Sequence, residues 1–271
     1  FDQIYFDSWK SLEHINTKYQ SEKFICLVHG NEILKDKNRD RIIKNISKSN
    51  TIIFNSHFTQ LLYKKKFVNS KIQKFNIIYP AFIDEIKKPD MSKKKYDFCT
   101  IARLEKRKGH QLILQALKKL KDIDNLSCSY AILGRGYELS QLKNQVVKYS
   151  LQNQVFFLDG LDRNQVLIDS KIHVMPTFLD ENSIEGFGIS NVEAAAYGLP
   201  CIVSTSGGTP ESIIQNETGF IVKERNVEDL YKAMKELITN KNQYDKFSSE
   251  SLAFAKGFLK KKKIIEYLNS L

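Results

Sequence analysis

Short apolar runs alternate with segments of helical periodicity along almost the whole chain, and this alternation constrains the fold more than any other feature. Residues 23–28 and 201–204 are apolar-rich runs of the kind found in strands that are buried on both faces. Strands separated by helices predict parallel βαβ units with right-handed crossovers. We therefore expect an α/β protein built from parallel sheets.

The same pattern places the individual elements. The expected strands are residues 23–28, 51–55, 75–79, 96–102, 127–133, 155–158, 172–176, 201–204 and 219–222. The expected helices are residues 39–47, 56–66 (with Ser56 as N-cap), 109–121, 138–150, 164–169, 189–197, 227–239 and 243–255. Periodicity is lost over residues 81–95, which gather Pro89 and several lysines and predict a linker. Two Rossmann-like domains follow, one of residues 1–88 and one of residues 89–271.

The chain is strongly basic, since 42 Lys and Arg against 31 Asp and Glu give a net charge of +11 over 271 residues. Such a surface attracts polyanions. No zinc-finger spacing, RNA-recognition signature or heptad-linked basic region is present, so we expect no specific nucleic-acid partner. Lysine runs such as residues 260–263 fit either solvated faces or loose attachment to an anionic membrane surface.

The cysteines Cys26, Cys99, Cys128 and Cys201 lie among apolar residues, without a CxxC pair or histidines at zinc spacing. We expect buried free thiols, and so a cytoplasmic protein, at most peripheral at the inner face of the membrane. No apolar run reaches the ~18 residues typical of a spanning helix.

In doubly wound sheets ligands bind beyond the carboxyl ends of the strands, and a basic loop follows one expected strand there. Residues 103–109 (RLEKRKG) stand between that strand and the next helix. A guanidinium from Arg103 and an ammonium from Lys108 can converge on a diphosphate beside a helix N-terminus. A solvated turn is the structural alternative.

Two carboxylates follow a later strand, within residues 185–193 (EGFGISNVE). Gly186 and Gly188 allow the backbone to approach a ligand closely. Glu193 lies in an otherwise apolar helix, which favours a polar pocket over a solvent-exposed face, and carboxylates suit sugar hydroxyls. The structural alternative, a carboxylate that complements the helix dipole, explains Glu185 better than Glu193.

Two further strand ends carry polar residues. Residues 206–211 (SGGTPE) form a glycine turn with Thr209 as the expected N-cap and Pro210 at the first helical position. His29, after the first expected strand, can donate to a sugar oxygen, although a lone histidine is often structural.

Taken together, these motifs resemble the signature of the retaining glycosyltransferases of family 4, which have the GT-B fold. Along the chain the matching segments are the basic loop, residues 156–160 (FFLDG), the glutamate pair with residues 194–200 (AAAYGLP) directly after it, and then residues 207–211 (GGTPE) and 218–220 (TGF). Their order and spacing together carry the resemblance. In the first section, residues 78–81 (IYPA) with Asp84 and residues 29–32 (HGNE) are also similar. The resemblance runs from about residue 23 to residue 239.

The resemblance implies a function and roles for individual residues. The reaction would be transfer of a hexose from a nucleotide-diphosphate sugar to a glycan or glycolipid acceptor of the cell envelope, with retention at the anomeric carbon. Arg103 and Lys108 would bind the donor diphosphate, and Glu193 the ribose hydroxyls. Glu185 would contact the transferred sugar with Gly186 and the amides of Phe187 and Gly188 nearby, and His29 would approach that sugar from the first domain. The family typically needs no metal, and we expect no cofactor.

One departure from the family pattern affects the first domain. Only 28 residues precede His29, whereas family members carry a glycine-rich loop and several βα units there, so we expect an incomplete acceptor domain. The chain is then a fragment, or a partner supplies the rest, and it binds donor but transfers sugar poorly. Two alternatives stay open: a sugar-nucleotide 2-epimerase of the same fold and a non-catalytic module that binds nucleotide sugars.

Overall fold

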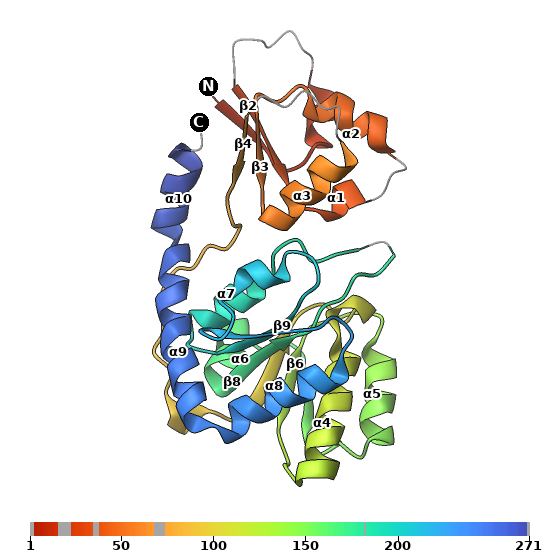
Figure 1. Ribbon diagram of the computed structural model, residues 1–271, viewed down its shortest axis with the longest axis vertical. Helices are drawn as coiled ribbons and strands as arrows, with labels where there is room; N and C mark the ends of the chain where they lie inside the picture. The colour runs from red at the N-terminus through yellow and green to blue at the C-terminus, as the bar shows by residue number, and fades with distance from the viewer. Residues whose placement is uncertain (1–2, 16–22, 35–37, 68–73, 182, 270–271) are drawn as a thin grey trace.

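The computed structural model describes residues 3–15, 23–34, 38–67, 74–181 and 183–269. Two parallel sheets stand one above the other in Figure 1. The first has the order β1-β2-β3-β4 and the second the order β10-β9-β8-β5-β6-β7. Every strand pair in both sheets is parallel. The predicted α/β fold with two parallel sheets is therefore confirmed.

The four-stranded sheet carries its helices on one face. Its strands are β1 (Gln3–Phe6), β2 (Lys23–Val28), β3 (Thr51–Phe54) and β4 (Lys74–Ile77), and its helices are η1 (Ser11–His14), α1 (Asn31–Leu34), α2 (Arg39–Ile46) and α3 (His57–Lys66). The Ser56 side chain accepts a hydrogen bond from the Thr59 amide, which confirms Ser56 as the N-cap of α3. Strand β1 and helix α1 were not predicted, and β4 ends two residues earlier than expected.

The six-stranded sheet has helices on both faces. Its strands are β5 (Tyr96–Ile101), β6 (Tyr130–Leu133), β7 (Val155–Leu158), β8 (Ser170–Met175), β9 (Cys201–Ser204) and β10 (Gly219–Val222). The elements around them are η3 (Met91–Lys93), η4 (Lys106–Lys108), α4 (His110–Asp124), α5 (Leu139–Lys148), α6 (Arg163–Asp169), α7 (Ile189–Ala195), η5 (Thr209–Ser212), α8 (Val227–Thr239) and α9 (Lys241–Ala255). Each predicted element of this half is present, with ends shifted by at most a few residues.

Side-chain alternation divides the core between the two faces of the six-stranded sheet. On β5, Phe98 belongs to the cluster under α4 and α8, whereas Cys99 belongs to the cluster under α6 and α7. All four cysteines are buried free thiols, as predicted. Burial raises the pKa of Cys26 and of Cys99 to about 12, because a thiolate loses its hydration there.

The C-terminal helices connect the two halves of the molecule. The chain continues from α9 through η6 (Lys256–Phe258) into α10 (Lys260–Asn269), which lies beside the four-stranded sheet (Figure 1). The Ile83 amide donates to the Phe258 carbonyl at 2.9 Å, and the Tyr5 hydroxyl donates to the Tyr267 carbonyl at 2.9 Å. Helix α10, which the periodicity did not predict, therefore packs against the half of the molecule that is far from it in sequence.

Candidate functional site

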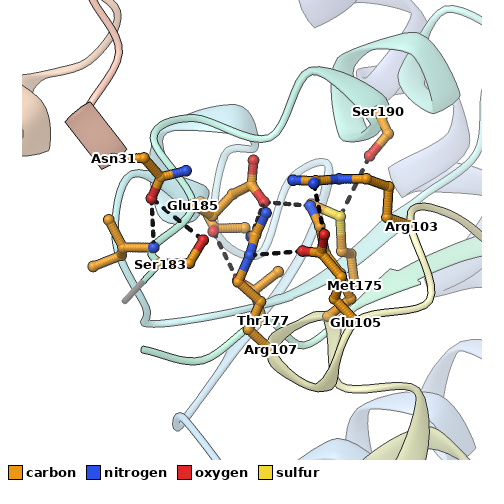
Figure 2. Close-up of polar contacts among 12 residues, drawn as sticks. Asn31, Arg103, Glu105, Arg107, Met175, Thr177, Ser183, Glu185 and Ser190 are labelled. Atoms are coloured by element: carbon orange, nitrogen blue, oxygen red, sulfur yellow. Dashed lines mark hydrogen bonds and ion pairs between the residues drawn. The ribbon is translucent and has the colours of Figure 1, made fainter. Parts of the chain in front are cut away.

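Loops that follow strands of both sheets meet each other. The Ile184 amide, in the loop after β8, donates to Asn31 Oδ1 at 2.7 Å (Figure 2). A side chain at Gly186 would place its Cβ 2.2 Å from the carbonyl oxygen of His29, which follows β2. The carboxyl ends of parallel strands are where ligands bind in this class of fold, so this contact region is the candidate site.

The basic loop after β5 turns two of its cations inward. The side chains of Arg107 and Lys108, on η4, are only 5% and 10% exposed. Gly109 follows with a φ of +75°, and a Cβ there would lie 2.3 Å from the Pro176 carbonyl oxygen, so only glycine lets the loop approach β8 this closely. Helix α4 begins directly after this turn.

Glu185 accepts hydrogen bonds from both inward cations. Arg107 Nη1 donates to Glu185 Oε2 at 2.9 Å (Figure 2). Lys108 Nζ donates to the same oxygen. Burial alone would raise the pKa of Glu185, but Lys108 and Arg107 together hold it below its ordinary value of 4.5. Burial, with Arg107 beside it, lowers the pKa of Lys108 in spite of the attraction of Glu185. The carboxylate is thus ionised, and Oε1, its second oxygen, can accept a hydrogen bond from a hydroxyl group.

Arg103 lies outside this buried cluster. Its side chain is 67% exposed and Nη1 lies 2.6 Å from Glu105 Oε1, and Glu105 in turn lies 3.3 Å from Arg107 Nε. Figure 2 shows the resulting row of alternating charges from Arg103 to Glu185. Arg103 can therefore turn toward an anion at the cost of a mostly exposed ion pair, which contributes little by itself.

Glu193 has different surroundings from Glu185. Its carboxylate accepts a hydrogen bond from Arg163 on α6, and burial raises its pKa against the effect of that cation. It lines a pocket of about 130 Å³ together with Phe82, Asp84 and Tyr197. The lining of this pocket includes neither Glu185 nor Lys108. The binding role of Glu193 stays a prediction.

The glycine-flanked turn between the two glutamates is held by an aromatic stack. The ring of Phe187 is buried and stacks on Tyr79 at a centroid distance of 4.7 Å. Gly188, with a φ of +102°, is the N-cap residue of α7. The packing of Phe187 therefore fixes the turn. The amides of Phe187 and Gly188 lie in the same loop as Glu185.

His29 presents its backbone, rather than its ring, to the loop of Glu185. Its carbonyl accepts a hydrogen bond from Asn55 Nδ2 at 3.0 Å and faces Gly186. The exposed ring places Nε2 2.9 Å from the Asp7 carbonyl, to which it donates as the Nε2–H form. The approach of this ring to a sugar stays a prediction.

Thr209 is not the helix cap that the sequence predicts. The helix that follows is the 3-10 turn η5, which has Gly208 at its N-cap, and Thr209 lies inside it. The Thr209 hydroxyl instead lies 3.0 Å from the Thr177 hydroxyl in the interior. The chain turns at Gly207, which has a φ of +63°, and the helix starts one residue earlier than the Thr-Pro pattern indicates.

Three charged residues that the structure brings into the site region were not predicted from the sequence. Arg107 and Arg163 pair with the two predicted glutamates, and Glu211 binds across to the other half of the molecule. Arg107 belongs to the same basic loop as Arg103, and the two arginines differ in how far their side chains are buried. Neither burial nor partners across sheets can be read from local spacing.

Within the described ranges, no group of three or more His, Cys, Asp or Glu side chains is arranged to hold a metal ion. Nor does any helix of the described residues combine the length and apolar character needed to cross a membrane. The acidic pair at Asp180 and Glu181 forms a tight turn, in which the Glu181 amide donates to Asp180 Oδ1 at 2.9 Å.

Residues 82–253 match the sequence profile of the family described as glycosyl transferases group 1. Over 172 residues the chain is 29% identical to the GDP-mannose-dependent alpha-(1-6)-phosphatidylinositol monomannoside mannosyltransferase of Mycobacterium tuberculosis, a match that covers 60% of this chain and 44% of the relative. It is 27% identical over 169 residues to the poly(glycerol-phosphate) alpha-glucosyltransferase of Bacillus subtilis, covering 60% of this chain and 24% of the relative. The match thus spans less than half the length of either relative.

Solved structures share the fold at low identity. The Anabaena protein Alr3699/HepE in complex with UDP superposes with a TM-score of 0.84 at 20% identity, and the match covers 100% of this chain and 79% of that one. The pneumococcal O-GlcNAc transferase GtfA in complex with UDP and GlcNAc gives a TM-score of 0.76 at 19% identity, covering 93% of this chain and 52% of that one. The architecture of both halves therefore agrees with that of GT-B glycosyltransferases.

Proposed function

We propose, because the chain belongs to the family of glycosyl transferases group 1, that it transfers a hexose from a nucleotide-diphosphate sugar to an acceptor with retention at the anomeric carbon. The observation that carries this proposal is the buried cluster of Glu185 with Arg107 and Lys108, which lies where loops from both sheets meet. It combines cations for a diphosphate with an ionised carboxylate for sugar hydroxyls. These are the two chemistries that a nucleotide sugar requires.

The donor would lie across the carboxyl ends of the six-stranded sheet. Lys108 and Arg103 would bind the diphosphate beside the N-terminus of α4, whose first amides also favour an anion. Glu193 would hold the ribose hydroxyls in the pocket next to Arg163. Glu185 would accept hydroxyls of the transferred sugar, with Gly186 and the amides of Phe187 and Gly188 close by.

The chemical step would break the bond between the anomeric carbon and the diphosphate oxygen and form a bond from that carbon to the acceptor hydroxyl oxygen. The electron pair of the broken bond leaves with the diphosphate, where Lys108 and Arg103 would stabilise the developing charge. The acceptor hydroxyl proton would pass to the departing diphosphate. His29 would face the sugar from the four-stranded sheet, and these residues together would need no metal or other cofactor.

The acceptor would be a glycan or glycolipid, since the two relatives described above are named for a phosphatidylinositol mannoside and for poly(glycerol-phosphate). A cytoplasmic protein with a net charge of +11 would meet such acceptors at an anionic membrane surface. The four-stranded half, within residues 1–88, would be the acceptor side. Residues 89–271 would form the donor side.

A two-stage experiment tests this function. Thermal-shift assays with UDP- and GDP-sugars first select the donor that stabilises the protein. The labelled donor is then incubated with a total extract of envelope glycans and glycolipids, and the products are separated. We expect label in the acceptor fraction and its loss in Arg103→Ala; epimerised nucleotide sugar, or binding without any product, would refute transfer and point instead to an epimerase or a binding module.

A further inference from the structure

The carboxylate of Glu211 reaches from the six-stranded half of the molecule to the four-stranded half. Glu211 lies on η5, after β9, and its Oε1 accepts from the Phe58 amide at 2.7 Å. Its Oε2 accepts from the His57 amide at 2.8 Å and from the Tyr79 hydroxyl at 3.1 Å. One side chain thus makes three hydrogen bonds between segments that are more than 130 residues apart in sequence.

These contacts satisfy donors that α3 cannot satisfy itself. The first amides of a helix have no partner within the helix, and the side chain of the N-cap Ser56 accepts from the amide of Thr59, the third residue of α3. His57 and Phe58 are the first two residues of α3, so Glu211 completes the cap from the opposite half. Its negative charge is also favourable at the positive end of the helix dipole. Burial and the neighbouring Glu211 raise the pKa of Tyr79 to about 12, in keeping with a protonated hydroxyl that donates to this carboxylate.

The backbone around this contact leaves no room for a side chain at Gly208. A Cβ at Gly208 would lie 3.0 Å from Ser56 Oγ and 2.0 Å from the Gly186 carbonyl oxygen. Gly186 in turn faces the His29 carbonyl, and Asn31 accepts from the Ile184 amide at 2.7 Å on the far side of the same loop. The capped helix, the Glu185 loop and the strand end of His29 are therefore parts of one contact surface.

We propose that Glu211 is a positioning residue, which docks α3 onto the turn after β9 and so sets His29 against the loop of Glu185. Its effect on turnover rests on the proposed function, whereas its effect on docking does not. Because His57 and Phe58 offer only N–H groups, the carboxylate is required as an acceptor on both oxygens. An amide at this position would turn its own N–H₂ group toward one of these donors.

The docking is measured by the distance between spin labels on Lys44→Cys and Gln141→Cys, two exposed positions in α2 and α5. The four native cysteines are buried, so the labels attach to the introduced thiols. We expect one narrow distance distribution in the labelled parent and a broader, longer one in Glu211→Gln. The control Glu217→Gln, at an exposed glutamate six positions further along, should match the parent.

Two further measurements distinguish a loss of docking from a loss of the fold. Far-UV circular dichroism should be unchanged in Glu211→Gln, which is isosteric, and the His57 and Phe58 amides should exchange hydrogen faster than in the parent. Tyr79→Phe, which removes one of the three donors and keeps the ring stacked on Phe187, should broaden the distance distribution less. A distance distribution in Glu211→Gln that equals the parent's would overturn the docking role.

The catalytic consequence has its own measurement. We expect Glu211→Gln to lower kcat by about 10²-fold, the typical effect of misplacing reacting groups by about 1 Å. The Kd for the free nucleotide should stay unchanged, because Arg103, Lys108 and Glu193, the groups proposed to bind the nucleotide, all lie within the six-stranded half. An equal loss of nucleotide affinity would overturn the positioning role. If neither protein transfers sugar, the proposed function fails, and the spin-label distances still decide the docking.

Discussion

Removing the charge of Glu185 should destabilise the six-stranded half more than any change to a surface ion pair. In Glu185→Gln the side chain keeps its shape, so no cavity forms, but Arg107 and Lys108 lose their counter-ion. Their side chains are 5% and 10% exposed, and that of Glu185 is 17% exposed. The perturbation is therefore the loss of one partner from a mostly buried ionic cluster.

The expected cost is about 3 kcal/mol of the free energy of unfolding at pH 7, the lower end of the range for leaving a buried charge unpaired. Two features of the site place the expected cost at the lower end of this range. The pKa of Lys108 is already lowered by burial, so the ammonium can lose its proton when its partner is gone. Arg107 keeps Glu105 within 3.3 Å as a second anion.

Urea unfolding followed by circular dichroism measures this cost. The matched control is Asp159→Asn, which breaks the 2.8 Å pair with Arg135, whose two side chains are 76% and 82% exposed. We expect no measurable change in that variant, because exposed pairs are screened by solvent. The fluorescence of Trp9, the only tryptophan, reports the four-stranded half separately.

The pH dependence of the free energy of unfolding independently checks that the charge of Glu185 is stabilising. The pKa of Glu185 is lowered in the folded state, so the unfolded chain takes up a proton first as the pH falls. The stabilising contribution is present above the ordinary value of 4.5 and is lost as the pH falls through the lower folded value. The difference between the parent and Glu185→Gln should be constant near neutrality and shrink in acid. A cost below about 1 kcal/mol at pH 7, or a difference that grows on acidification, would refute the buried cluster.

Three further predictions concern the donor. Arg103→Ala and Glu193→Ala should each weaken nucleotide-sugar binding by about 1.5–3 kcal/mol, the usual cost of losing hydrogen bonds to a charged group; parent affinity for both variants in calorimetry would contradict the proposed roles. Because the pKa of Glu193 is raised, nucleotide affinity should begin to fall on acidification while the pH is still above 4.5, and Glu193→Gln should abolish this dependence. Donor binding and turnover should survive EDTA, since Lys108 and Arg103 supply the positive charge; a strict requirement for Mg²⁺ or Mn²⁺ in either assay would count against this.

Local sequence was sufficient for most of the architecture. The strands β2, β7, β9 and β10 and helix α8 have the predicted bounds, because each is an uninterrupted apolar run or a helical period between turn residues. Strand β1 was missed since its residues Gln3 to Phe6 are only partly apolar, and pairing with β2 is what makes them a strand. Helix α10 was missed because four lysines begin it, and one of them, Lys263, is buried over the Phe258 ring at 4.9 Å.

In the candidate site, too, some features follow from the sequence and others only from the tertiary structure. Sequence order by itself determined that Glu185, Glu193 and the basic loop follow strands of one parallel sheet, since the alternation of strands and helices places all such loops at one edge. Only the tertiary structure decided that Arg107 is buried against Glu185 while Arg103 stays exposed, and that Glu211 caps a helix of the other sheet. Periodicity encodes which face of an element is apolar, whereas the partner of a charge depends on where segments far apart in the chain come to rest, and the cost of leaving a buried charge or amide unpaired then selects among those partners.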